Sequence, residues 1–164
     1  MTKVALVITS LLTIWHAPDG PVLVRHARRS GGSEYVQALA TAAEDASRAY
    51  RLDPLLLVTL AHQESGLDWQ AVQSRTRARG LLQLMPRSTW GIAAARACRA
   101  GKDACVRAQM FEGARALRYA LDACRASEIH AITFHRFGQC GRVIRWRERR
   151  VIVLRNRMRK AVGA

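Results

Sequence analysis

A run of apolar residues that follows Asp53 and Pro54 restricts the fold of this chain more than any other feature. Nearly every residue from 55 to 61 is apolar, so a helix over 54–64 would be apolar almost all round. Such a helix has to lie at the centre of a globule. Asp53 predicts its start, because an Asp side chain caps free backbone N–H groups and Pro suits the first helical position. Gly66 predicts its end.

The remaining sequence also favours helices. Hydrophobic residues make up 49% of the 164 residues and aromatic residues only 6%, a mixture that favours helix over sheet. Apolar residues recur at three- and four-residue steps from Glu34 to Tyr50, which predicts one buried helix face. Residues 67–86 contain Gly80 and Pro86 and have no helical period, which indicates an ordered loop. Further helices are expected from about Arg87–Ser88 and over 104–124, 127–137 and 142–162. The prediction is an all-α globular domain of about six helices.

The first 33 residues differ from the rest of the chain. Residues 1–17 place Lys3 before a short apolar run, the layout of a secretory signal peptide. An uncleaved N-terminal anchor, or simply an apolar first helix, remains the alternative. Residues 18–33 read as a linker, and residues 34–164 as the domain. We therefore expect an exported protein of the periplasm or cell envelope, which would touch a membrane only through an uncleaved N-terminal segment.

The cysteines and the net charge indicate the compartment and the partners of the domain. Four cysteines (Cys98, Cys105, Cys124 and Cys140) in an exported chain predict two disulfides, with three possible pairings; four free thiols are the alternative. Their spacing supports no zinc site, and no cofactor is expected. The net charge of +15 predicts anionic partners. Nine basic residues and one acid lie between residues 142 and 160, and the apolar stripe of this segment predicts that its arginines point outward.

Glu64 is the candidate catalytic residue. It ends the apolar helix, where a carboxyl group is partly removed from water and its protonated form is favoured. Such a group can hand a proton to a leaving oxygen. Position alone is weak support, because most Glu residues at helix ends are solvated.

Two motifs strengthen this interpretation. Residues 62–68 read His-Gln-Glu-Ser-Gly-Leu-Asp, and residues 80–89 read Gly-Leu-Leu-Gln-Leu-Met-Pro-Arg-Ser-Thr. Together they resemble the lytic transglycosylase family with the goose-lysozyme-like fold, and residues 111–117 are similar to a later helix of that family. Asp103-Ala104-Cys105 is similar to a motif of small secretion-associated members. The resemblance spans about residues 36–160 and implies a lysozyme-like helical domain with a substrate groove.

The resemblance also implies roles for single residues. Glu64 matches the catalytic acid/base, and the other matches imply sugar binding. Ser74 matches only approximately, because the interval from Glu64 to Gly80 is one residue longer than in the common form of the family, and Arg77 stands where the family has Gly. The implied substrate-binding residues are Ser65, Ser74, Gly80, Gln83, Met85, Phe134 and His135.

The main departure from the family lies near residue 135. The family has Tyr-Asn-x-Gly there, whereas this chain reads Thr-Phe-His-Arg-Phe-Gly over 133–138. Either His135 or Phe134 replaces the Tyr, depending on the alignment. A histidine could donate a hydrogen bond or, when protonated, hold the Glu64 carboxylate ionised; a purely structural histidine is the alternative.

The resemblance implies a one-carboxylate reaction on peptidoglycan. The Glu protonates the bond between N-acetylmuramic acid and N-acetylglucosamine, and the sugar's own 6-hydroxyl then closes a 1,6-anhydro ring. Most glycosidases use two carboxylates; Asp68 is the nearest second one and is interpreted as structural. A role beside secretion, conjugation or phage machinery is expected. A non-catalytic cell-wall-binding protein on the same fold, a hydrolytic lysozyme and a basic nucleic-acid-binding protein remain alternatives, although the chain carries no recognised nucleic-acid-binding module.

Overall fold

The computed structural model describes residues 32–140 and 146–161. This part of the chain contains α-helices and one short 3-10 helix, and no strand, so the predicted all-α, lysozyme-like fold is confirmed. The predicted signal peptide and nearly all of the predicted linker lie outside the described residues. The elements are α3 (Gly32–Tyr50), α4 (Pro54–Ser65), α5 (Thr89–Ala97), η1 (Cys98–Ala100), α6 (Lys102–Ala123), α7 (Glu128–Phe137) and α8 (Trp146–Ala161).

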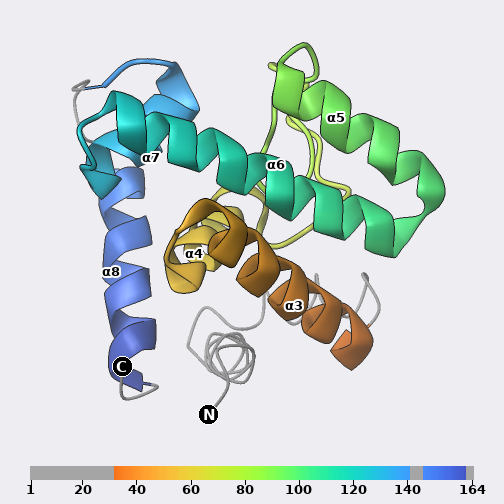
Figure 1. The fold of residues 1–164 in the computed structure, drawn as a ribbon, viewed down its shortest axis with the longest axis horizontal. Coiled ribbons are helices and arrows are strands. Elements are labelled where there is room, and N and C mark those ends of the chain that lie inside the picture. Colours follow the sequence, from red (N-terminus) through yellow and green to blue (C-terminus); the bar gives the residue numbers. More distant parts are fainter. Residues whose placement is uncertain (1–31, 141–145, 162–164) are drawn as a thin grey trace.

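Helix α4 is the central helix, as the sequence predicts. All residues from Leu55 to Ala61 are buried. The Asp53 side chain accepts a hydrogen bond from the Leu55 backbone N–H at 3.0 Å, and Gly66 ends the helix in the left-handed conformation, with φ 64°. Helices α3 and α8 pack against α4, and Figure 1 shows α4 between them at the centre of the molecule. The predicted caps and the predicted core position of this helix are therefore confirmed.

Helix α6 connects the two sides of the molecule. It packs against α3, α5 and α7 and crosses the view from α7 to the far end of α5 in Figure 1. Gly113 lies where α6 meets the loop between α4 and α5, and a Cβ atom there would fall 2.0 Å from Leu82 Cδ1. The motif at 80–89 and the segment 111–117 therefore meet in the core, where glycine makes room for leucine.

The loop between α4 and α5 is held by backbone pairing although it forms no strand. Arg79 makes isolated bridges with Val72 and with Leu84, and the Gly80 N–H donates to the Ala71 carbonyl at 2.8 Å. Ser88 then caps α5 by accepting from the Gly91 N–H at 3.0 Å. The loop is ordered, as predicted, because its backbone groups find partners within the loop.

Both expected disulfides are present, and no described cysteine is free. Cys98 pairs with Cys105 across η1 and the start of α6. Cys124, at the end of α6, pairs with Cys140 beyond α7. The alternative of four free thiols is therefore wrong, and the pairing that the sequence left open joins neighbours along the chain.

The expectation that all arginines of the segment 142–160 point outward is wrong for Arg155 of α8. The Arg155 side chain is only 8% exposed and lies between Asp53 and Glu128, at 3.3 Å and 2.9 Å. Glu148 is buried and pairs with Arg136 of α7 at 3.2 Å. Charged groups remain in an interior when an opposite charge compensates them, which the apolar pattern of α8 does not reveal.

No helix in the described ranges is long and apolar enough to cross a membrane.

The Arg155 contacts predict a stability effect. Arg155→Met should lower the free energy of unfolding by about 2–3 kcal/mol, because it leaves the carboxylates of Asp53 and Glu128 without their buried partner. Arg157→Met, on the exposed face of the same helix, should change it by less than about 0.5 kcal/mol. Urea unfolding followed by circular dichroism measures both. Equal effects of the two substitutions would show that the buried ion pairs contribute nothing.

Candidate active site

Glu64 lies in the last turn of α4 and is partly exposed. Within the described part of the chain, no hydrogen bond or ion pair engages its carboxyl group. A buried apolar helix thus delivers an uncommitted carboxyl group to the surface. A general acid needs this arrangement, because a carboxyl group held in a salt bridge would not be available to a substrate.

The backbone just after Glu64 is fixed from α3. Gly66 and Leu67 both have positive φ values, of 64° and 65°, so the chain turns sharply away from the helix axis. The buried Tyr35 hydroxyl donates a hydrogen bond to the Leu67 carbonyl. Burial, together with the nearby Asp68 charge, raises the pKa of the Tyr35 hydroxyl far above its usual value, so this donor keeps its proton. The end of α4 is therefore held in one position.

Two polar neighbours of Glu64 are occupied by local hydrogen bonds. The Ser65 hydroxyl donates back to the Ala61 carbonyl at 3.0 Å. Asp68 accepts from the Gln70 N–H at 2.9 Å, which is a turn within the loop. Both arrangements fit structural roles, and the Asp68 contact agrees with its interpretation as structural.

A cavity of about 390 Å³ lies between the loop and α7. Four of the residues implied as substrate-binding line it: Gln83, Met85, Phe134 and His135. Residues from the loop and from α7, about 50 positions apart in the sequence, therefore share one surface. Glu64 is not among the lining residues; it ends the helix from which the loop departs.

Two of these four residues also hold the loop in shape. The Gln83 side-chain amide donates to the Gly80 carbonyl at 2.9 Å, and Gln83 itself has a positive φ of 48°. His135 Nε2 lies 3.0 Å from the Leu82 carbonyl. Because a carbonyl oxygen only accepts, Nε2 carries the hydrogen and Nδ1 is left for another partner. His135 thus has a structural contact and also lines the cavity; its contact to Glu64, the other interpretation from the sequence, stays a prediction.

An aromatic row borders the same cavity and was not predicted. The Tyr119 ring lies 5.8 Å from both Trp90 and Phe134, measured between ring centroids, and Trp90 and Phe134 line the cavity. Tyr119 is 56% exposed. The spacing of Tyr119 along α6 could only have indicated a surface position, because its aromatic neighbours come from α5 and α7.

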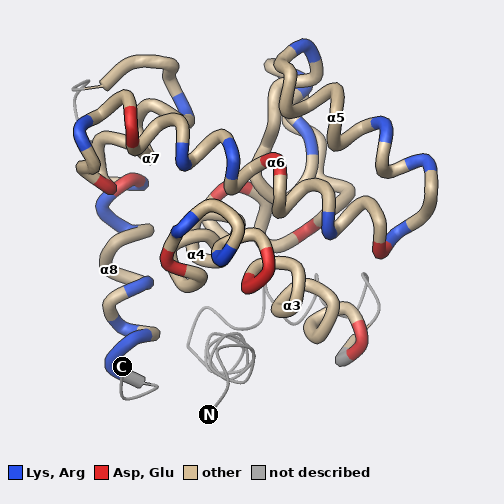
Figure 2. The backbone as a smooth tube through the Cα atoms, viewed as in Figure 1, with Lys and Arg blue, Asp and Glu red and all other residues tan. Residues whose placement is uncertain are grey.

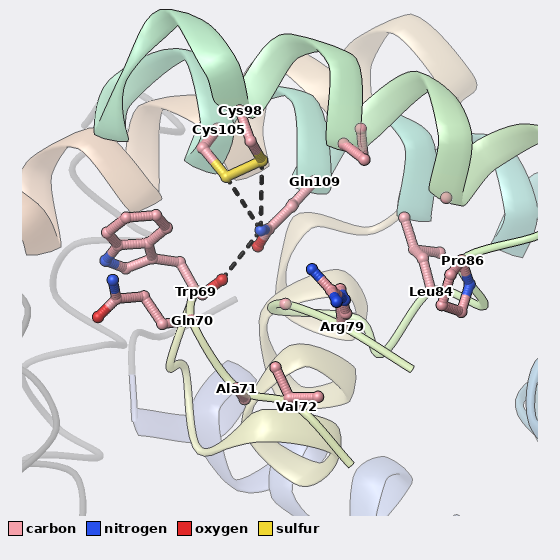
Figure 3. Close-up of a pocket in the computed structure, with 14 residues that line it drawn as sticks. Trp69, Gln70, Ala71, Val72, Arg79, Leu84, Pro86, Cys98, Cys105 and Gln109 are labelled. Carbon is pink, nitrogen blue, oxygen red and sulfur yellow. Dashed lines mark hydrogen bonds between the residues drawn. A yellow bond between two sulfur atoms is a disulfide. The ribbon is translucent and has the colours of Figure 1, made fainter. Parts of the chain in front are cut away.

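A second cavity of about 410 Å³ lies on the other side of the loop, against α5, η1 and α6. Figure 3 shows it bordered by Trp69, Val72 and Arg79, with the Cys98–Cys105 disulfide above. Of the residues implied as substrate-binding, only Gly80 lines this cavity. The loop therefore separates two hollows of similar size, and the implied sugar-binding residues concentrate in the one beside α7.

Gln109 of α6 fastens the loop from this second side. Its Oε1 accepts from the Leu81 N–H at 2.9 Å. Its Nε2 donates to the Trp69 carbonyl at 2.9 Å and lies 3.2 Å from Cys105 Sγ; these contacts are drawn in Figure 3. A buried amide with its groups paired holds one geometry, because leaving them unpaired is costly. The sequence pattern marks Gln109 only as a polar residue within a helix.

The family model of the transglycosylase SLT domain matches residues 41–104. Residues 41–104 are therefore similar to a transglycosylase SLT domain. Domains of this family are those of lytic transglycosylases, lyases that act on the peptidoglycan of the cell envelope. No curated protein and no solved structure matches the chain.

The match divides the implied site residues into two groups. Glu64 and the residues of the loop fall inside the matched part of the SLT domain, whereas Phe134 and His135 follow it. The matched part thus ends before the segment in which this chain departs from the family's Tyr-Asn motif. The cavity residues that differ from the family's motif therefore come from α7.

Three of the implied substrate-binding residues lie outside the cavity beside α7. Ser65 is one of them, and its hydroxyl donates to the Ala61 carbonyl. Ser74 is exposed on the loop and lines neither cavity. Gly80 is buried, and a Cβ atom there would lie 2.3–2.5 Å from the Gln109 amide. In this chain the Gln109 amide accounts for glycine at position 80; the substrate-binding role that the resemblance implies for Gly80 stays a prediction. Among the described residues, no three His, Cys, Asp or Glu side chains gather as a metal ion would require.

The Gly80 contact predicts a difference between two glycines. Gly80→Ala and Gly138→Ala both place alanine at a positive φ, of 73° and 71°, but a Cβ atom at Gly138 meets nothing within 4 Å. Gly138→Ala should lower the free energy of unfolding by about 1 kcal/mol. Gly80→Ala should cost at least about 2 kcal/mol more, because moving the Gln109 amide breaks its buried hydrogen bonds. Equal losses in thermal and urea unfolding would contradict the proposed role of Gln109.

Proposed function

We propose that this protein is a peptidoglycan lytic transglycosylase in which Glu64 is the single acid and base. The reaction cleaves the β-1,4 bond between N-acetylmuramic acid and N-acetylglucosamine and leaves a 1,6-anhydro-N-acetylmuramic acid end. The observation that carries the proposal is a carboxyl group without a described partner at the end of a buried helix, in a matched SLT domain. The loop that leaves this helix lines a cavity with the implied sugar-binding residues.

The chemistry needs one carboxyl group twice. Glu64 first gives its proton to the glycosidic oxygen, and the bond from this oxygen to C1 of the muramic acid breaks with its electron pair on the oxygen. The carboxylate then takes the proton of the 6-hydroxyl while O6 forms a bond to C1. The substrate's N-acetyl group stabilises the positive charge at C1 between the two steps. Glu64 ends with the proton it started with, and no water is consumed.

The contacts of the nearby carboxyl groups fit a one-carboxylate mechanism, in which Glu64 acts from the end of α4 and not from the lining of the cavity beside α7. Asp68, the nearest carboxylate along the chain, is bonded to the Gln70 N–H. Hydrolytic glycosidases position a second carboxylate across the scissile bond, whereas Asp68 is held in a turn of the loop.

His135 takes the place of the family's tyrosine in this proposal. Its ring is anchored through Nε2 to the Leu82 carbonyl, so the ring orientation is fixed before substrate arrives. Nδ1 then serves as a polar contact for the sugar. Phe134, which lines the same cavity and packs against Tyr119, supplies apolar surface for a sugar ring.

The setting we propose is the cell envelope. Two disulfides are typical of proteins that leave the cytosol, and the substrate lies outside the cytoplasmic membrane. A small domain that cuts the glycan serves local opening of the cell wall by a secretion, conjugation or phage apparatus.

The second candidate is a non-catalytic peptidoglycan-binding protein on the same fold. The absence of the family's tyrosine near residue 135 favours it. Both candidates use the cavity beside α7, so they differ in turnover and agree in binding.

The product of the reaction distinguishes these candidates. Purified peptidoglycan treated with the wild type should release anhydro-muropeptides, one water lighter than lysozyme products, as measured by mass spectrometry. Glu64→Gln should lower their release at least about 100-fold, because the amide cannot deliver the proton. Asp68→Asn is the matched control. It keeps an oxygen that can accept from the Gln70 N–H, so it should retain near wild-type release.

Each other outcome rejects a stated part of the proposal. Hydrated fragments whose release requires both Glu64 and Asp68 would make the protein a hydrolytic lysozyme. No fragments from the wild type, with wild type and Glu64→Gln both sedimenting with the cell wall, would favour the binding protein.

A matched pair of substitutions tests which cavity takes the glycan. Met85 and Val72 are similarly exposed, at 49% and 50%, and each lines only one cavity. Met85→Ala should weaken binding to peptidoglycan about 5- to 30-fold through lost apolar contact, measured by sedimentation with the Glu64→Gln protein. Val72→Ala should leave binding unchanged. The reverse pattern would move the substrate groove to the second cavity.

A further inference from the structure

The outer face of α8 is basic and also exposes large apolar side chains. Trp146 is 62% exposed and Val153 is 49% exposed. Exposed basic residues surround them on the same helix, and Figure 2 shows Lys and Arg concentrated along α8. These basic residues are Arg147, Arg149, Arg150, Arg157 and Lys160; Arg159 is also exposed but pairs with Asp53 at 2.8 Å.

The exposed residues form one stripe because of their spacing. Trp146, Arg149, Arg150, Val153, Arg157 and Lys160 follow each other at steps of one, three or four residues, and the overall progression keeps them on one face of a helix. The opposite face of α8 is buried and contains Glu148, the only acid of the helix. The outer face of α8 therefore carries basic and apolar side chains and no acid from this helix.

The tryptophan is placed among the positive charges. The guanidinium carbons of Arg147 and Arg150 lie 5.6 Å and 6.0 Å from the Trp146 ring centroid. Arg155 does not belong to this exposed stripe, because it is buried between Asp53 and Glu128. The residues of the stripe are thus different from those that attach α8 to the rest of the fold. None of them lines either cavity.

We propose that the outer face of α8 docks on the surface of an anionic lipid bilayer. Charge alone would suit any polyanion. An exposed Trp and Val within a basic stripe fit the bilayer interface in particular, where an indole ring lies at headgroup level and guanidinium groups meet lipid phosphates. The proposal does not rest on the proposed catalytic function. It differs from the expectation that only an N-terminal segment touches the membrane.

The test uses the full chain and vesicles of phosphatidylcholine with or without phosphatidylglycerol. The wild type should sediment with the phosphatidylglycerol vesicles and not with pure phosphatidylcholine. Removing two charges in Arg149→Gln/Arg157→Gln should weaken binding about 30-fold. Arg96→Gln/Arg99→Gln is the matched control, because it removes two exposed charges at the far end of α5 and η1. It should weaken binding less than about threefold.

Tryptophan fluorescence identifies the residue that enters the interface. The vesicles should shift the emission of the wild type to shorter wavelength, because the indole of Trp146 leaves water. Trp146→Phe should lose this shift, whereas Trp69→Phe should keep it. Circular dichroism verifies that each variant is folded.

Three results would overturn the proposal. The first is equal weakening by the two double variants, which would indicate attraction by net charge alone. The second is no binding of the wild type to phosphatidylglycerol vesicles. The third is binding without an emission shift, together with release by an anionic cell-wall polymer, which would identify such a polymer as the occupant.

Discussion

The buried amide of Gln109 is the contact on which the site depends. It joins α6 to the loop at Leu81 and Trp69 and touches the Cys98–Cys105 disulfide. Because its donors and acceptor are used at once, a shift of α6 or of the loop would leave buried groups unpaired. The loop therefore has one position relative to α6, and the cavity on its other side has one shape. Glycine at position 80 is a consequence of this contact.

His135 of α7 also holds this loop. It stands in the segment where the chain departs from the family's Tyr-Asn motif. A side chain that replaces the expected tyrosine keeps the loop and α7 together through Leu82. His135 therefore lines the cavity and holds the loop at the same time, and its Nδ1 is the atom that the proposed function assigns to the sugar. In the proposed reaction an imidazole of fixed orientation takes the place of the family's phenol.

Ion pairs join α8 to the start of α4, and other basic residues of α8 are exposed at the surface. Arg155 and Arg159 of α8 reach Asp53, the residue that also caps α4. One carboxylate thus starts the central helix and anchors the last one. Other arginines of α8 are exposed, and in the proposal their stripe docks on an anionic surface. A single basic helix therefore serves both the core and the exterior.

The sequence by itself determined the all-α class, the limits of α4 and the place of Glu64, because apolar periodicity and capping residues act over a few neighbouring positions. It also indicated the loop motif, whose match to the SLT domain covers Glu64 and Gln83. Only the tertiary structure decided the disulfide pairing, the burial of Arg155 and the role of Gln109. It likewise decided that Gly80 faces an amide, and that Phe134 and His135 share a cavity with the loop. These contacts join residues distant in the chain, and no local pattern records which of them the packing of helices brings together.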